Sequence, residues 1–150
     1  GSNTTMIDEG LAKSMNCQTL KRGVAREINY VDRKVETKSD KVLVTVRRGR
    51  NLHTLSAWTV KELAKRTGVV DWSVQKKHFD HLKDIPFPAL PSPATIGILI
   101  GTDHNDFFSC SKVVESPKAN QPRATLTPLG WTCTGPSAPG TAKFSASLFE

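Results

Sequence analysis

The chain has 150 residues, 37% of them hydrophobic and 23% charged, which is enough for a buried core and ordinary for a globular domain. Three cysteines exclude a disulfide-rich scaffold and favour free thiols in a reducing compartment. No run reaches the roughly 18 apolar residues of a membrane span, so we expect no membrane segment and a location in the cytoplasm or inside a cytosolic particle. The net charge of +7 is spread along the chain, apart from a short cluster at Arg47, Arg48 and Arg50. Without a recognition motif, this charge makes nucleic-acid binding only a secondary hypothesis.

The first sixty residues predict one short helix followed by two hairpins. Acidic residues in the first turn favour a helix starting at Asp8. A first hairpin is expected over Lys21 to Lys38, with its tip near Asn29–Arg33. Alternating valines then predict a second hairpin from Val42 to Val60, with a turn at Arg47–Asn51.

Residues 61–94 differ in character and are expected to form a helical insert. Asp71 is a plausible N-cap for a helix in which Trp72, Lys76, Phe79 and Leu82 share one face. Prolines then force an extended connector; they are Pro86, Pro88, Pro91 and Pro93.

The remaining chain predicts a further set of strands. Thr95–Gly101 is apolar and β-branched, as expected of a strand buried on both faces. Asp103 is predicted to cap a short helix, and strands are expected at Lys112–Glu115 and Ala124–Cys133. The expected fold class is therefore mainly β, with one domain over residues 1–136 and a Pro/Gly/Ser-rich linker over residues 137–150.

Two motifs carry chemical information. Residues 1–7 read Gly-Ser-Asn-Thr-Thr-Met-Ile, and residues 98–104 read Ile-Leu-Ile-Gly-Thr-Asp-His. The first resembles the active-site loop of retropepsin-type aspartic proteases, which begins Asp-(Ser/Thr)-Gly, with its first two residues missing. The second resembles the apolar-apolar-Gly strand end and short helix that form the second signature of that family. Two candidate hairpins lie between the motifs, in the order that retroviral proteases use.

Further strings resemble the proteases of Pao-like retrotransposon polyproteins, and the resemblance covers roughly residues 1–136. Residues 57–60 resemble their strand before the insert. Residues 71–73 and 81–86 resemble the insert and its exit, and residues 128–131, with Gly135-Pro136 behind them, resemble the block that closes the domain. The ordered set is more specific than any one string.

This resemblance implies a retropepsin-like half-barrel that lacks its first strands, and a homodimer in which each subunit supplies one aspartate. Two aspartates sharing a proton would activate water against a peptide of the parent polyprotein, with no metal or organic cofactor. The catalytic aspartate would lie immediately upstream of Gly1, and no acid in the chain replaces it. We therefore expect the chain, as an N-terminally incomplete fragment, to be inactive alone.

The resemblance also implies roles for individual residues. Those of the substrate cleft are Gly1, Ser2, Asn3 and Thr5. Those of the flap are Asn29, Tyr30, Val31, Asp32 and Arg33, although this tip lacks the glycines of retroviral enzymes. Those with a structural role in the second motif are Ile100, Gly101 and Asp103.

Several alternatives stay open. Gly1-Ser2 is also what a cleaved tag leaves behind, whereas Asn3, Thr5 and Ile7 fit the motif independently. His78, His81 and Asp84 could suggest zinc, but a solvated helix face explains them better. Ser109-Cys110-Ser111 lacks the glycine elbow of a nucleophile. The main rival function is a non-catalytic, protease-like binding or spacer module of a retroelement protein, with basic nucleic-acid affinity.

Overall fold

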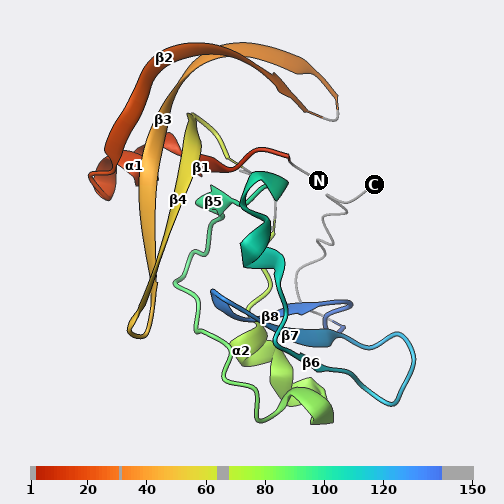
Figure 1. Cartoon of the computed structure of the whole chain (residues 1–150). Coiled ribbons are helices and arrows are strands. Elements are labelled where there is room, and N and C mark those ends of the chain that lie inside the picture. The colour runs from red at the N-terminus through yellow and green to blue at the C-terminus, as the bar shows by residue number, and fades with distance from the viewer. Residues whose placement is uncertain (1–2, 31, 64–67, 140–150) are drawn as a thin grey trace. The chain divides into compact units, whose positions relative to one another are not determined.

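The computed structural model describes residues 3–30, 32–63 and 68–139 and shows a mainly β chain, as expected (Figure 1). The chain divides into two compact units. The first, which we call the five-stranded unit, contains the described residues up to Leu63 together with Gly97–His104. The second, the three-stranded unit, contains the described residues between them and those from Asn105 onward. No helix among the described residues is long and apolar enough to cross a membrane.

The five-stranded sheet has the order β2-β3-β4-β1-β5. Its strands are β1 (Met6–Asp8), β2 (Gln18–Asn29), β3 (Lys34–Arg48), β4 (Asn51–Val60) and β5 (Ile98–Leu99). Strands β2, β3 and β4 pair antiparallel, whereas β1 pairs parallel to β4 and antiparallel to β5. The short strand β1 therefore lies between two strands that run in opposite directions and come from distant parts of the chain.

Both predicted hairpins are confirmed. Strands β2 and β3 pair up to Asn29 opposite Lys34, and β3 and β4 pair up to Arg48 opposite Asn51. The pairing of β2 with β3 shifts register between Thr19 and Val24, and Asp40 Oδ1 accepts a hydrogen bond of 2.8 Å from the backbone N–H of Gly23 there. Such irregularities bend a strand, and Figure 1 shows the β2–β3 hairpin curving strongly along its length.

One face of this sheet carries the core of the five-stranded unit. Alternate residues of a strand share a face, and the buried side chains follow this rule: Ile7, Val42, Val44, Leu55 and Ala57 are all at most 4% exposed. The predicted helix is α1 (Glu9–Ser14), which buries Ala12. Asp8 caps it, because its Oδ1 accepts a hydrogen bond of 3.0 Å from the backbone N–H of Leu11.

The three-stranded unit contains β6 (Lys112–Val114), β7 (Arg123–Thr127) and β8 (Gly130–Thr134), paired antiparallel in that order. Its core is formed by Leu82, Ile85, Phe87, Ala124 and Cys133, with Trp72, Phe79, Val114 and Trp131 packed against it. The strand predicted over residues 124–133 is thus two strands. A tight turn separates them, in which Thr127 Oγ1 accepts a hydrogen bond of 3.2 Å from the N–H of Leu129.

The prediction of one helix after Asp71 was wrong. Asp71 does cap α2, accepting from the Ser73 N–H at 3.0 Å, but α2 covers only Trp72–Gln75. Two 3-10 turns follow, Lys76–His78 and Asp80–Leu82, separated by Phe79 in an extended conformation. The break lets Phe79 pack 6.3 Å from the ring of Trp72, between ring centroids. Core packing here outweighs local helix propensity.

The prediction of a doubly buried strand over Thr95–Gly101 was also wrong. Only Ile98 and Leu99 form β5, and both are half-buried. Among the described strands, β5 lies at the edge of the sheet and pairs only with β1. A short apolar run can form an edge strand that is covered on one face. The periodicity of such a run does not distinguish this edge strand from a strand buried on both faces.

Candidate functional site

The two motifs identified in the sequence lie side by side. In the register of β1 with β5, Met6 is opposite Leu99 and Ile7 is opposite Ile98. On its other side, β1 pairs with β4, placing Met6 opposite Trp58. The carbonyl of Thr5, the residue before β1, accepts a hydrogen bond of 3.0 Å from the N–H of Trp58.

Thr5 is the centre of the contact between the motifs. It is fully buried, and its Oγ1 donates to Asp103 Oδ1 at 2.6 Å while its backbone N–H donates to Asp103 Oδ2 at 3.0 Å. The same Oγ1 accepts from the backbone N–H of Gly101 at 3.0 Å. The hydroxyl and the amide of Thr5 are therefore both held by the second motif.

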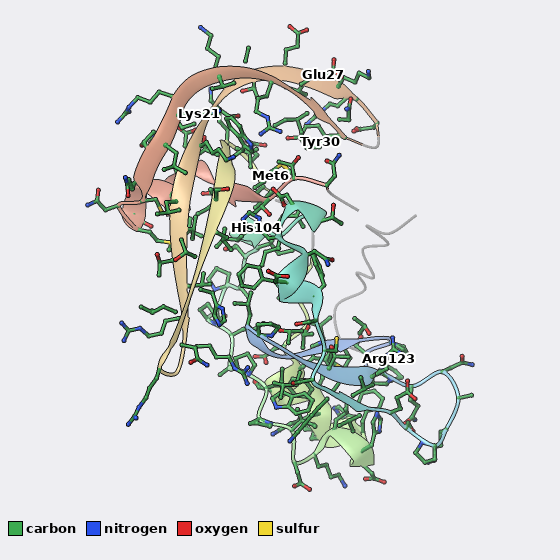
Figure 2. All side chains as sticks on the ribbon, viewed as in Figure 1. Met6, Lys21, Glu27, Tyr30, His104 and Arg123 are labelled. Carbon is green, nitrogen blue, oxygen red and sulfur yellow. The ribbon has the colours of Figure 1, made fainter. Side chains whose placement is uncertain are left out.

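His104 completes this network, which we call the Thr5 network: Thr5, Ser56, Gly101, Asp103 and His104. The Nε2 of His104 accepts a hydrogen bond of 3.1 Å from the backbone N–H of Ser56, so the proton of the neutral ring is on Nδ1. Nδ1 lies 2.9 Å from Thr5 Oγ1 and 3.3 Å from Asp103 Oδ1. Since the Thr5 hydroxyl gives its hydrogen to Asp103, His104 is the donor to that oxygen. Figure 2 shows His104 and Met6 on the side toward which the β2–β3 hairpin curves.

The charge of Asp103 is set by these contacts. Burial alone would raise the pKa of this carboxyl, but the hydrogen bonds from the hydroxyl and the backbone N–H of Thr5, together with His104, outweigh burial and lower it below its usual range. The carboxylate is therefore ionised and accepts hydrogen bonds on both oxygens. The expected helix-cap role was wrong: Asp103 lies within a pair of 3-10 turns (Thr102–Phe108) that kink at His104, and it binds Thr5.

Gly101 has no space for a side chain. A Cβ at this position would lie 2.5 Å from the backbone C and N atoms of Thr4, closer than any real Cβ contact. The two chain segments can pass this closely only because residue 101 is glycine. Ile100, the preceding residue of the motif, is half-buried.

The other predicted cleft residues are less constrained. Asn3 is exposed, and its Oδ1 accepts a hydrogen bond of 3.3 Å from Thr4 Oγ1. Gly1 and Ser2 lie outside the described residues. Asn3 and Thr5 lie two residues apart on the loop that leads into β1, and of these two Thr5 is the one hydrogen-bonded to the second motif.

The predicted flap residues lie at the turn of the β2–β3 hairpin. Asn29 ends β2, and the Tyr30 N–H donates to the Arg33 carbonyl at 2.7 Å to close the turn. The guanidinium of Arg33 also lies 5.2 Å from the centroid of the Tyr30 ring. Asp32 is exposed between them, and Val31 lies outside the described residues.

Two residues of the zinc and nucleophile alternatives, His81 and Ser109, make hydrogen bonds to backbone carbonyls. His81 Nε2 donates to the carbonyl of Pro122 at 2.7 Å, and His78 is exposed. Ser109 Oγ donates to the carbonyl of Asp106 at 3.0 Å. Within the described ranges, no group of three or more His, Cys, Asp or Glu residues is arranged to hold a metal ion.

Sequence reasoning missed Arg26 and Lys41, whose side chains lie over the ring of Trp58. Arg26 has its guanidinium carbon 4.2 Å from the centroid of the Trp58 ring, and Lys41 Nζ lies 5.6 Å from the same centroid. Trp58 and His104 both stood in strings that pointed to the family, but without register nothing in those strings showed what they contact.

Comparisons of the chain with protein-family models, with curated proteins and with solved structures found no match.

Proposed function

We propose that this chain is the greater part of a retropepsin-type aspartic protease domain, which processes the polyprotein of a Pao-like retrotransposon. One observation carries the proposal: the loop that resembles the active-site motif is bound, through Thr5, to the segment that resembles the second motif. Two chance matches separated by 98 residues would have no reason to meet, whereas two parts of one active site must.

The arrangement around β1 supports the same proposal. The loop before β1 would continue upstream into Asp-(Ser/Thr)-Gly, so the catalytic carboxylate would lie close to Asn3, at the end of β1 where Thr5 is anchored. The β2–β3 hairpin curves on the side of the sheet that carries Met6 and His104 (Figure 2). A hairpin in that place can cover a bound peptide, exclude water and hold the peptide backbone.

The chemistry needs two aspartates, one from each subunit of a homodimer. Because they share one proton, one is ionised and acts as the general base on a water molecule, and the protonated one donates to the scissile carbonyl. The described residues of this chain would position the catalytic aspartate and would not react themselves. The hydrogen bonds of the Thr5 network hold in place the loop that would carry the aspartate, and a catalytic group needs such support from the residues behind it.

Asp103 does not supply the missing acid. Both of its oxygens accept hydrogen bonds from Thr5, and its lowered pKa keeps it ionised. The proposal therefore includes inactivity of the 150-residue chain alone, and it places the intact enzyme in the cytoplasm or inside a virus-like particle.

The cheapest test is to read the roughly 30 codons upstream of Gly1. An in-frame Asp-(Ser/Thr)-Gly joined directly to the first motif, in a gene with polymerase motifs downstream, would support the protease. An intact gene without that tripeptide would contradict it and favour a non-catalytic module. In parallel, pepstatin-sensitive peptide cleavage by the 150-residue chain itself would contradict the positional role given to Asp103 and Thr5.

A further inference from the structure

The side of the sheet toward which the hairpin curves carries a continuous row of side chains. Residues directly opposite in neighbouring strands point to the same face, and the register aligns Lys21, Lys41, Trp58, Met6 and Leu99 across β2, β3, β4, β1 and β5. The row runs from two lysines, over an indole, to the strand that follows the Thr5 loop. It is basic at one end and apolar at the other.

Arg26 reaches this row from the curved part of the hairpin. Its guanidinium stacks 4.2 Å from the Trp58 ring centroid, while Lys41 Nζ lies 5.6 Å from the same ring. Two cations on one indole repel each other, although each gains from the ring. The carboxylate of Asp103 also attracts Arg26 and opposes the lowering of the Arg26 pKa by burial.

One nitrogen of Arg26 is left without a partner. Among the residues that the structure describes, Nη1 of Arg26 is buried and has no hydrogen-bond acceptor. The carboxylate of Asp103, which binds Thr5, does not accept a hydrogen bond from this nitrogen. A buried N–H without an acceptor is costly, and more so on a charged group. A carboxylate that pairs with the rest of the guanidinium would offset this cost by neutralising its charge.

We propose that Arg26, supported by Lys41 and Trp58, binds an acidic side chain of the peptide that lies beneath the hairpin. The inference rests on the proposed protease function and gives it a substrate preference for Glu or Asp near the scissile bond. A guanidinium presents a planar fork that matches a carboxylate, and its stacking on Trp58 holds that fork in one orientation. Lys41 adds a second positive charge without competing for the same geometry.

The surroundings of Arg26 favour a peptide over a nucleic acid. Its neighbours on the same face of the hairpin are Val24, Ile28 and Val35, which are half-buried and apolar. On the opposite face, the acids Glu27 and Glu36 pair with each other across the strands, and Glu27 Oε1 lies 3.2 Å from Lys34 Nζ. A nucleic-acid backbone is bound by several Lys or Arg residues that are not paired with acids. The β2–β3 hairpin carries acidic as well as basic residues, so it does not provide such a surface.

The test uses the full 150-residue chain and a pair of fluorescein-labelled peptides that differ only in Glu or Gln at one central position. Fluorescence anisotropy should show about tenfold tighter binding of the Glu peptide, as expected for one charge-assisted hydrogen bond at a partly exposed site. Arg26→Gln should abolish the difference. Arg22→Gln, which removes the same charge from an exposed position of the same strand, should keep it.

Three results would overturn the inference: equal binding of the two peptides, a preserved preference in Arg26→Gln, or tighter binding of a single-stranded oligonucleotide that depends on Arg26. If Arg26→Gln fails to fold by circular dichroism, the comparison of Glu and Gln peptides on the unchanged chain decides. The assay does not require cleavage. If the upstream-extended protein cleaves peptides but shows no preference for acidic residues, only the inference about Arg26 is refuted. If the chain prefers the Glu peptide but the extended protein cleaves nothing, only the protease function is refuted.

Discussion

Asp103 holds Thr5 by two hydrogen bonds, one from the Thr5 hydroxyl at 2.6 Å and one from its backbone N–H at 3.0 Å, across 98 residues of sequence. This relationship joins the loop before β1 to the segment after β5. The ionised carboxylate of Asp103 therefore has a structural role. The conformation of the loop before β1 depends on whether this carboxylate is ionised.

Thr5→Val should destabilise the five-stranded unit. Valine keeps the shape of threonine but leaves a lone pair of Asp103, the N–H of Gly101 and the Nδ1–H of His104 without the hydroxyl they contact. Losing a buried hydrogen-bond partner costs about 1–3 kcal/mol, measurable as a lower urea midpoint followed by tryptophan fluorescence. Thr5→Ser keeps the hydroxyl and should lose less than half as much. Equal losses in the two variants would show that the methyl group, not the network, matters.

Gly101→Ala should cost more than Gly97→Ala. The new Cβ at 101 would lie 2.5 Å from backbone atoms of Thr4, whereas at 97 it would lie 2.4 Å from Leu11 Cδ2, the end of a flexible side chain. Overpacking against backbone typically costs about 1–3 kcal/mol, while a leucine can rotate away. Thermal unfolding of the two variants should differ in this order. The reverse order would mean that the two motifs do not approach as closely as described.

Acid should weaken the Thr5 network. Because the folded-state pKa of Asp103 is lowered, its contribution to stability is complete above the unfolded value of about 3.9. The contribution is lost as the pH falls from there through the lower folded value. Urea titrations between pH 6 and pH 2.5 should show this loss in the unchanged chain and a flatter dependence in Asp103→Asn.

Asp80→Asn is the matched control for that titration. The pKa of Asp80 is also lowered, by its hydrogen bond and ion pair with Lys83, but the carboxylate is exposed and the pair is screened by solvent. The acid dependence of Asp80→Asn should follow the unchanged chain. If Asp103→Asn follows it as well, the carboxylate does not carry the stabilisation.

Thiol reactivity should report the core of the three-stranded unit. Cys133 is buried, and burial raises the pKa of its thiol to about 12 despite a hydrogen bond from the Thr134 backbone. Cys110 is exposed. Since the thiolate is the reactive form, a maleimide should modify Cys110 promptly in native protein and Cys133 only in urea, as read by mass spectrometry. Modification of both at one rate would contradict the described packing around Leu82 and Phe87.

Local patterns predicted the local elements well. Valine alternation and the turn at Gly49 placed the second hairpin, and acids at Asp8 and Asp71 marked two helix starts, because these signals act within a few residues. The interruption at Phe79 could not be predicted in this way. It depends on contacts of that ring with Trp72 and the core, which outweigh the helical pattern.

The candidate site shows the same division. The motif strings identified Thr5, Gly101 and Asp103, but the bond between Thr5 and Asp103 requires the register of β1 with β5, which sequence spacing does not contain. Arg26 was missed for a related reason. The register shifts between Thr19 and Val24 change the phase of β2, so a strict alternation from the start of the strand does not show which face Arg26 occupies.

The most direct test of the central proposal is peptide cleavage by the chain extended upstream through an in-frame Asp-(Ser/Thr)-Gly. A fluorogenic peptide should be cleaved by the extended protein, with inhibition by pepstatin. It should not be cleaved by the 150-residue chain, nor by the extended protein with the upstream aspartate replaced by asparagine. A folded, dimeric extended protein that cleaves nothing, or cleavage that survives the asparagine replacement, would contradict the assignment to aspartic proteases.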